Sequence, residues 1–127
     1  MNLEDYRNYC LSLPHVTEAM PFGENTLVFK IGDKLFSLTD IEMFESVNLK
    51  CEPELAIQLR EQYSGVLPGY HMNKKHWNTV KTNGSISDDL LKQWTLDSYE
   101  LVRKGLPAKI REQLNVDEKN GGTQSWL

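Results

Sequence analysis

The sequence predicts an α+β fold in which an antiparallel sheet, formed by a three-strand meander and one later strand, is backed by helices. Apolar residues recur every three or four positions over residues 3–13 and 87–102, which is the spacing of amphipathic helices. Residues 27–50 alternate around a Gly-Asp pair, as in a β-hairpin followed by a further strand. A length of 127 residues is typical of one domain.

The first helix is expected between Asn2, a favourable N-cap residue, and Pro14, which cannot continue a helix. Residues 15–25 have no clear period and contain Pro21 and Gly23, so they are expected to form a connector with room for a short edge strand. The apolar stripe of this first helix is Leu3, Tyr6, Cys10 and Leu13.

Two strands are expected at residues 27–31 and 34–39, joined by Gly32 and Asp33. Such a two-residue loop suits a type II′ turn, in which glycine supplies the positive φ at the first central position. A third strand is expected around residues 44–50. Three consecutive strands of this kind form an antiparallel meander.

A second helix is expected to open at Pro53, which suits a first helical turn, and to end at Ser64 and Gly65. Thr79 and Val80 then predict the later strand. The buried side of the second helix is expected to be Leu55, Ala56 and Leu59.

Ser87 is a favourable N-cap for a long third helix, which Gly105 is expected to stop. Pro107 is expected to open a last helix that runs through Leu114. Residues 1–114 are therefore predicted to form one domain.

The final segment, residues 115–127, is polar and has no apolar period, so it is predicted to be a loosely held tail. No apolar run approaches the roughly 20 residues that span a bilayer. The N-terminus also lacks a basic region followed by an apolar stretch. We therefore expect no membrane association and a cytoplasmic location.

Charge is distributed unevenly along the chain, whose net charge is -4. Residues 1–61 carry eleven acids and five bases, and residues 88–127 carry seven acids and six bases. Residues 62–87 contain three lysines and no acid at all. An anionic ligand responds to such a local field more than to the total charge.

The segment from Gly69 to Trp77 holds two lysines, two histidines and two aromatic residues. Lysines that meet phosphates beside aromatic stacking surfaces are typical of a nucleic-acid contact. The alternative is structural, with Tyr70, Met72 and Trp77 in the core, Asn73 capping a turn and the lysines solvated. The residues predicted to contact DNA are Lys50, His71, Lys74, Lys75, His76, Trp77 and Lys81.

No catalytic or metal-binding constellation is expected. His71 and His76 are five positions apart, a spacing that places them on different faces of a strand or helix. Cys10 and Cys51 have no neighbouring histidine and are expected to be small core residues. No glycine-rich phosphate loop follows a strand and opens a helix. We therefore expect a protein that is not an enzyme and uses no cofactor.

Glu18 and Glu24 are the candidates for an acid and base pair, with solvated turn residues as the alternative. Ser64, His71 and Asp88 have the residue types of a hydrolytic triad, but no nucleophile-elbow motif accompanies them.

Several short motifs, taken in order, resemble one known family. They are Leu13-Pro14 with Glu18 and Pro21-Phe22-Gly23, then Lys34-Leu35-Phe36, Val47-Asn48-Leu49-Lys50-Cys51 with Pro53-Glu54, Gly69-Tyr70-His71-Met72-Asn73-Lys74-Lys75-His76-Trp77, and Ser98-Tyr99 with Leu101-Val102. The chain is similar in this pattern to the MmcQ/YjbR family, and the His-Met-Asn-Lys-x-His-Trp run is its most specific part. The resemblance covers residues 1–114.

This resemblance implies a CyaY-like α+β fold and DNA binding through a double-wing arrangement. It supplies no catalytic residues. The CyaY-like fold is shared with frataxin-like proteins, in which iron binding requires a first helix dense in acids. The first helix here has only Glu4 and Asp5, so iron is not expected.

The sequence thus predicts a non-catalytic DNA-binding module. Because the net charge is acidic, this function requires the lysines to lie on one face. The alternative is a non-catalytic module whose groove beside the same segment accepts a protein segment or a small anionic ligand.

Overall fold

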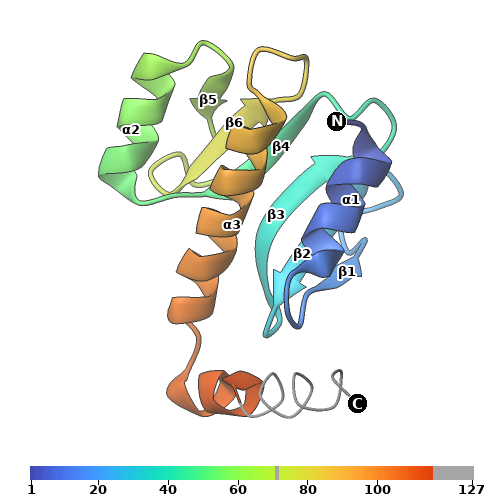
Figure 1. Ribbon diagram of the computed structural model, residues 1–127, viewed down its shortest axis with the longest axis vertical. Coiled ribbons are helices and arrows are strands. Elements are labelled where there is room, and N and C mark those ends of the chain that lie inside the picture. The colour runs from blue at the N-terminus through green and yellow to red at the C-terminus, as the bar shows by residue number, and fades with distance from the viewer. Residues whose placement is uncertain (71, 116–127) are drawn as a thin grey trace.

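The computed structural model describes residues 1–70 and 72–115, and its helices pack against a single sheet (Figure 1). Residues 108–115 are also helical. In chain order the remaining elements are α1 (Leu3–Ser12), β1 (Thr17–Ala19), β2 (Thr26–Ile31), β3 (Lys34–Asp40), β4 (Ser46–Lys50), α2 (Pro53–Gln62), β5 (Val66–Pro68), β6 (Trp77–Lys81) and α3 (Asp88–Lys104).

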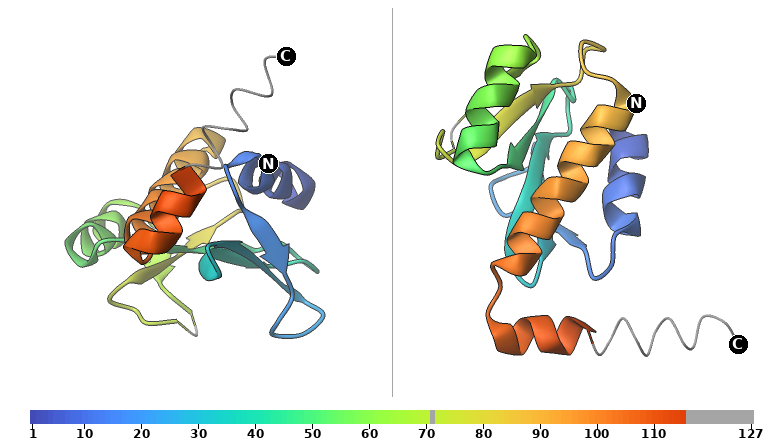
Figure 2. Two further views of the ribbon diagram at one scale, coloured as in Figure 1. Left: turned by 90° about the horizontal axis from the view of Figure 1, so that it is seen from below. Right: turned by 60° about the vertical axis from the view of Figure 1, so that its left-hand side comes forward.

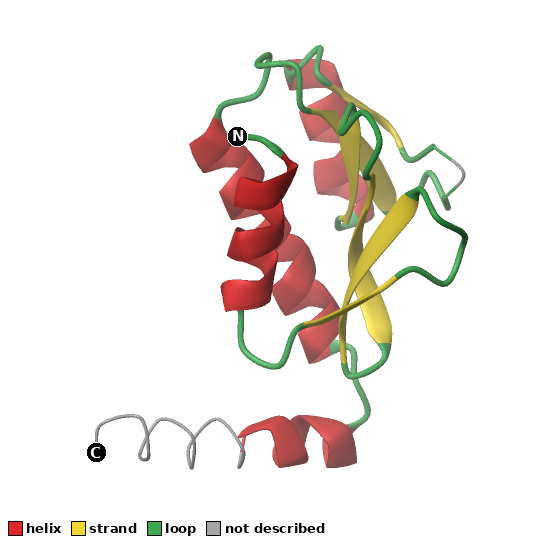
Figure 3. Ribbon diagram, turned by 90° about the vertical axis from the view of Figure 1, so that its right-hand side faces the viewer, coloured by secondary structure: helices red, strands yellow, loops and turns green. Residues whose placement is uncertain are grey.

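The sheet has six strands in the order β1-β2-β3-β4-β6-β5, and every neighbouring pair is antiparallel. Strands β2, β3 and β4 form the expected meander, and β6 is the later strand that joins it. Helices α1, α2 and α3 all lie on one side of the sheet (Figures 2 and 3). The prediction of an α+β fold with a helix-backed antiparallel sheet is confirmed.

Both predicted N-caps are confirmed. The Asn2 side chain accepts from the Asp5 backbone N–H at 2.8 Å, and Asp5 returns a contact to the Asn2 backbone, which completes a capping box. The Ser87 hydroxyl accepts from the Leu90 N–H at 3.1 Å.

Some local predictions are wrong. The hairpin turn is type I′ rather than type II′, because Asp33 (φ 65°) is left-handed as well as Gly32 (φ 56°). The third strand begins at Ser46, since Phe44 has a φ of 47° that breaks the extended backbone before it. Leu55 is not buried but 41% exposed.

Strand β5 was not expected from the sequence. It is three residues long and contains a proline, and both properties weaken a strand pattern. It pairs with β6 at the edge of the sheet, where a missing N–H is tolerated.

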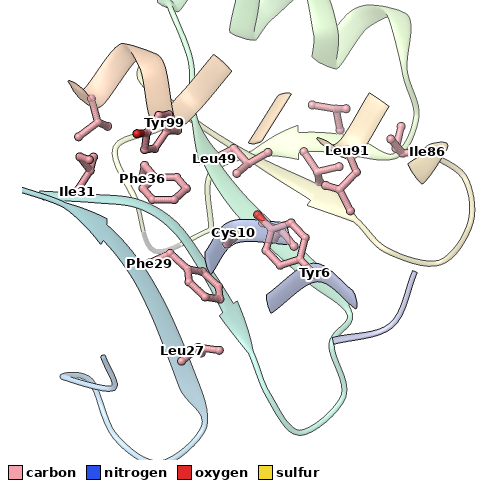
Figure 4. Packing of buried hydrophobic residues seen from close by; sticks show 14 of the residues in the cluster. Tyr6, Cys10, Leu27, Phe29, Ile31, Phe36, Leu49, Ile86, Leu91 and Tyr99 are labelled. Atoms are coloured by element: carbon pink, nitrogen blue, oxygen red, sulfur yellow. The ribbon is translucent and has the colours of Figure 1, made fainter. Parts of the chain in front are cut away.

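The core lies between the sheet and the helices, and Tyr6 is buried at its centre (Figure 4). Its ring meets Phe29 edge to face at 6.0 Å. Its hydroxyl lies 2.7 Å from the Ser37 Oγ and 3.1 Å from the Thr95 Oγ1. One side chain therefore joins α1, β3 and α3.

A second buried hydroxyl joins α3 to the sheet. The Ser98 Oγ accepts from the Lys50 backbone N–H at 2.9 Å and donates to the Phe36 carbonyl at 2.6 Å. The pairing of β3 with β4 ends at Ser37 and Leu49, immediately before this point. The hydroxyl is thus inserted between the two strands where they separate.

None of the described helices is long and apolar enough to span a bilayer. The predicted tail lies almost entirely in residues 116–127, which are outside the described part of the chain. Its separation from a domain at residues 1–114 stays a prediction.

Replacing Tyr6 by phenylalanine is expected to lower the free energy of unfolding by about 1–3 kcal/mol, because two buried hydroxyl groups lose a partner. Urea denaturation measures the change. The control is Tyr9→Phe on the same helix, whose hydroxyl donates to the Lys92 carbonyl at the surface. A larger loss for the control than for Tyr6→Phe would contradict the central role of Tyr6.

Candidate nucleic-acid interface

The two faces of the sheet differ in what covers them. Helices cover one face, while the β1–β2 loop (residues 20–25) and the described part of the β5–β6 loop (residues 69–70 and 72–76) project from the other (Figure 2, left). We call this second surface the helix-free face. Along each strand it receives every second side chain.

Three strand lysines lie on the helix-free face. Lys30 alternates with the fully buried Phe29, and Lys50 and Lys81 alternate with Leu49 and Val80, which point into the core. On the opposite side, each of α1, α2 and α3 carries one more acidic than basic residue. These three lysines and the small acidic excess of the helices therefore lie on opposite sides of the sheet, while Asp40 of β3 shares the face of the lysines.

Trp77 lies directly across from Lys50 in the β4–β6 pair. The two side chains share the helix-free face, because residues opposite one another in an antiparallel pair point the same way. Trp77 is half-buried and His76 precedes it with similar burial. The His76 carbonyl accepts from the Cys51 N–H at 2.8 Å, which holds the end of the loop against the end of β4.

The base of the β5–β6 loop is fixed by backbone contacts. The Gly69 N–H donates to the Trp77 carbonyl at 2.8 Å, and the Tyr70 N–H donates to the Thr79 Oγ1 at 2.9 Å. A Cβ atom at Gly69 would lie 2.7 Å from that of Trp77, so only glycine permits this approach. Thr79 in turn donates to the Asn48 Oδ1 at 2.7 Å, which ties the loop to β4.

The tip of the loop presents two lysines. The Asn73 Oδ1 accepts from the Lys75 N–H at 2.9 Å, and the Asn73 carbonyl accepts from the His76 N–H at 3.2 Å. Arg60 of α2 donates from Nη1 to the Lys74 carbonyl at 2.9 Å. Lys74 and Lys75 are both exposed, and Arg60 contacts the backbone of this tip rather than the lysine side chains.

The structure brings together five of the seven predicted contact residues: Lys50, Lys74, Lys75, His76 and Trp77. Lys81 shares their face but lies four positions from Trp77 along β6, a separation of about 13 Å. It lines a shallow hollow of about 560 Å³ between β6 and the β3–β4 connection. His71 is outside the described residues.

The structural alternative holds in part. Asn73 does cap the turn, and Met72 and Trp77 are half-buried, but Tyr70 is 68% exposed and is not a core residue. The loop therefore combines a fixed base with an exposed tip.

Sequence reasoning missed two basic residues. Lys30 could have been found, because the alternation of side chains along β2 places it on the other face of the strand from Phe29 and Ile31. Arg60 could not, since nothing in a helical sequence shows that its side chain reaches a loop 14 residues later.

Burial opposes nucleophilic chemistry at both cysteines. It raises the pKa of the Cys10 thiol to about 12. Burial, reinforced by the nearby Asp97 and Glu52 carboxylates, raises the pKa of Cys51 from an ordinary value of 9.0 to about 11. Thiols with such high pKa values are largely protonated at neutral pH.

Of the remaining candidates for acid–base or triad chemistry, Glu18 and Asp88 have other partners, and His71 is outside the described residues. Glu18 is hydrogen-bonded by the Arg7 guanidinium (Nε–Oε2 2.7 Å), which lowers the pKa of the Glu18 carboxyl, and Glu24 is exposed. Asp88 pairs with the N-terminal amine at 2.8 Å. Among the described residues, no group of three or more histidine, cysteine or acidic side chains is arranged to hold a metal ion.

A family model described as YjbR matches residues 11–101. The protein YbdF of Escherichia coli O157:H7 is 38% identical over 112 residues, which are 87% of this chain and 92% of that protein. YjbR of Escherichia coli K12 is 33% identical over 115 residues, covering 90% of this chain and 98% of its own. Both are named as uncharacterized proteins.

Solved structures agree with these relatives. The crystal structure of Deinococcus radiodurans protein DR2400, described with a DUF419 domain, matches with a TM-score of 0.84 at 39% identity over 90% of this chain and 88% of that one. A Pseudomonas syringae protein matches with a TM-score of 0.68 at 28% identity, covering 80% of this chain and 98% of its own.

Alkylation of Cys51 by iodoacetamide at pH 8 is expected to be about tenfold or more slower than that of a small unhindered thiol. A pKa of about 11 leaves about 100-fold less thiolate than a pKa of 9.0, which outweighs the higher nucleophilicity of that thiolate. The rate should still rise between pH 9 and pH 10. Peptide mass spectrometry separates Cys51 from the buried Cys10, and a rate that levels off below pH 8 would indicate an activated thiolate instead.

Replacing Arg60 by glutamine is expected to loosen the tip of the loop, because the Lys74 carbonyl loses a charged donor. Amide hydrogen exchange should become about 3–10-fold faster at the Lys75 and His76 N–H groups, with global stability little changed. The exposed Arg111→Gln is the matched control. Equal exchange rates in the two variants would show that Arg60 does not order the loop.

Proposed function

The chain belongs to the YjbR family, and we propose that it is a non-catalytic module which binds DNA through the helix-free face of its sheet. The β5–β6 loop contributes the principal phosphate contacts. DNA binding also accords with the cytoplasmic location expected from the sequence, which remains part of the proposal.

The observation that carries this proposal is the placement of lysines on the helix-free face and on the β5–β6 loop. DNA is a polyanion, and a protein with a net charge of -4 can approach it only through a surface that is locally basic. The helix-free face supports such an approach, because Lys50 lies on it at the base of the loop that carries Lys74 and Lys75, and Lys30 and Lys81 lie farther away on the same face.

The loop has the two kinds of side chain that such a contact uses. Lys74 and Lys75 are exposed cations on a tip whose backbone is held by Arg60 and Asn73, so only the lysine side chains need to be ordered when phosphate binds. Tyr70 and Trp77 offer aromatic surfaces next to them. His76 lies between the lysines and Trp77 in the sequence.

The arrangement of the two projecting loops also supports the proposal. The β1–β2 and β5–β6 loops flank the helix-free face like a pair of wings (Figure 2, left). This is the kind of double-wing arrangement that the family resemblance implies for DNA binding.

A protein segment is the second candidate ligand. Five large apolar side chains on the loops and edges of the helix-free face are exposed, and an apolar rim favours a peptide more than a phosphate backbone. They are Met20, Phe22, Met43, Leu67 and Tyr70. Salt separates the two candidates, since counterion release makes DNA binding weaken steeply with salt whereas apolar contacts persist.

The chain is expected to bind a 20-base-pair duplex of mixed sequence at 50 mM salt and to lose affinity steeply at 200 mM. Changing Lys74 and Lys75 together to glutamate should weaken binding at 50 mM salt about tenfold or more. The slope of log K against log salt should also fall by about 2, since two phosphate contacts are lost. Fluorescence anisotropy of a labelled duplex measures both quantities.

The matched control is Lys104→Glu with Lys109→Glu, which makes the same charge change at exposed positions outside the helix-free face. Equal losses in the two double variants would mean that only net charge matters, and the loop assignment would be wrong. Absence of duplex binding at 50 mM salt would refute the proposal. Full competition by millimolar inorganic phosphate would favour a small-anion module.

A further inference from the structure

A pocket of about 300 Å³ lies on the helix side of the sheet, between α2 and α3 and above β4 and β6. It is separate from the helix-free face, because the sheet stands between them. Its volume is at the lower end of the range that small-molecule sites occupy. The DNA proposal makes no use of it.

The walls of the pocket suit an apolar body. Leu59, Trp94 and Leu101 line it as partly buried side chains, and the Trp94 ring is held edge to face against Tyr63 at 5.1 Å. Leu55 also lines it and is 41% exposed, although it lies on a helix that packs against the sheet. A ligand in the pocket would cover apolar surface that is now open to water.

The rim of the pocket is predominantly acidic. Glu52, Asp97 and Glu100 line it, opposed by Lys104. Lys50 contributes to the lining too, but the alternation along β4 directs its side chain to the helix-free face. The Asp97 and Glu52 carboxylates also raise the pKa of Cys51, which lines the same pocket, as expected of a negative local potential.

The floor of the pocket includes an amide with an unused acceptor. Asn78 is only 2% exposed, and its position opposite Leu49 directs it towards the helices. Its Nδ2 donates to the Ala56 carbonyl at 3.3 Å, while its Oδ1 has no hydrogen-bond partner among the described residues. This oxygen is closed to solvent, so it is an unsatisfied polar atom beneath the pocket, and it adds to the negative potential that favours a cationic ligand.

We propose that this pocket binds a small primary amine with an aromatic or branched aliphatic body. The body contacts the leucines and Trp94, and the ammonium group lies among the rim carboxylates. An ammonium group supplies hydrogen-bond donors and the positive charge that the rim favours, whereas a carboxylate supplies neither.

Titration with phenethylamine, followed by ¹H–¹⁵N correlation spectra, tests the proposal. Saturable shifts are expected at the amides of Leu55, Cys51 and Leu101, with a dissociation constant on the order of 1 mM or tighter for so small a ligand. The neutral 2-phenylethanol should bind at least about fivefold more weakly, and 3-phenylpropionate more weakly still. Tight binding of 3-phenylpropionate would overturn the assignment of ligand charge.

Two exposed aliphatic residues on α2 form a matched pair. Leu55 lines the pocket, whereas Ile57, which is 49% exposed, does not. Leu55→Ala should weaken phenethylamine binding about threefold or more, and Ile57→Ala should leave it unchanged. Equal effects of the two variants, or chemical shifts that never saturate, would contradict the proposal that phenethylamine binds in this pocket.

A second pair tests the rim. Asp97→Asn with Glu100→Gln should weaken phenethylamine binding about fivefold or more and leave 2-phenylethanol unaffected. The control is Asp89→Asn with Glu112→Gln, which removes two exposed acids that do not line the pocket. Equal weakening of phenethylamine binding in the two double variants would mean that only net charge matters. The proposed contact between the ammonium group and the rim carboxylates would then be wrong.

Discussion

The buried Ser98 hydroxyl is the contact that joins α3 to both β3 and β4. It lies between the Phe36 carbonyl and the Lys50 N–H, so β3 and β4 separate at a fixed point while both remain bonded to α3. Beyond that point the chain leaves the sheet, and Lys50 and Cys51 are directed to opposite sides. The Lys50 side chain lies on the helix-free face, and Cys51 lines the pocket between α2 and α3.

The five residues of β6 also alternate between the two sides of the sheet. Trp77, Thr79 and Lys81 belong to the helix-free face, while Asn78 and Val80 line the pocket on the other side. The two surfaces for which we propose ligands of opposite charge thus share one strand. Because their side chains alternate, substitutions can alter one surface without entering the other.

Much of this fold could be predicted from the sequence because its signals are local. The Asn2 and Ser87 caps and the β2–β3–β4 meander depend on spacing and on neighbouring residues. The type I′ turn could not be distinguished, since it depends on Asp33 adopting a positive φ that aspartate only tolerates. The candidate face was predicted at its loop, but Arg60 and the pocket depend on contacts between distant segments, which no local pattern encodes.

The lysines of the helix-free face and of the β5–β6 loop make the positive field of this protein local, since its net charge is -4. With a Debye length of about 8 Å at physiological salt, an anion feels that field only when it approaches these lysines closely, and at greater distances the acidic remainder of the surface is screened as well.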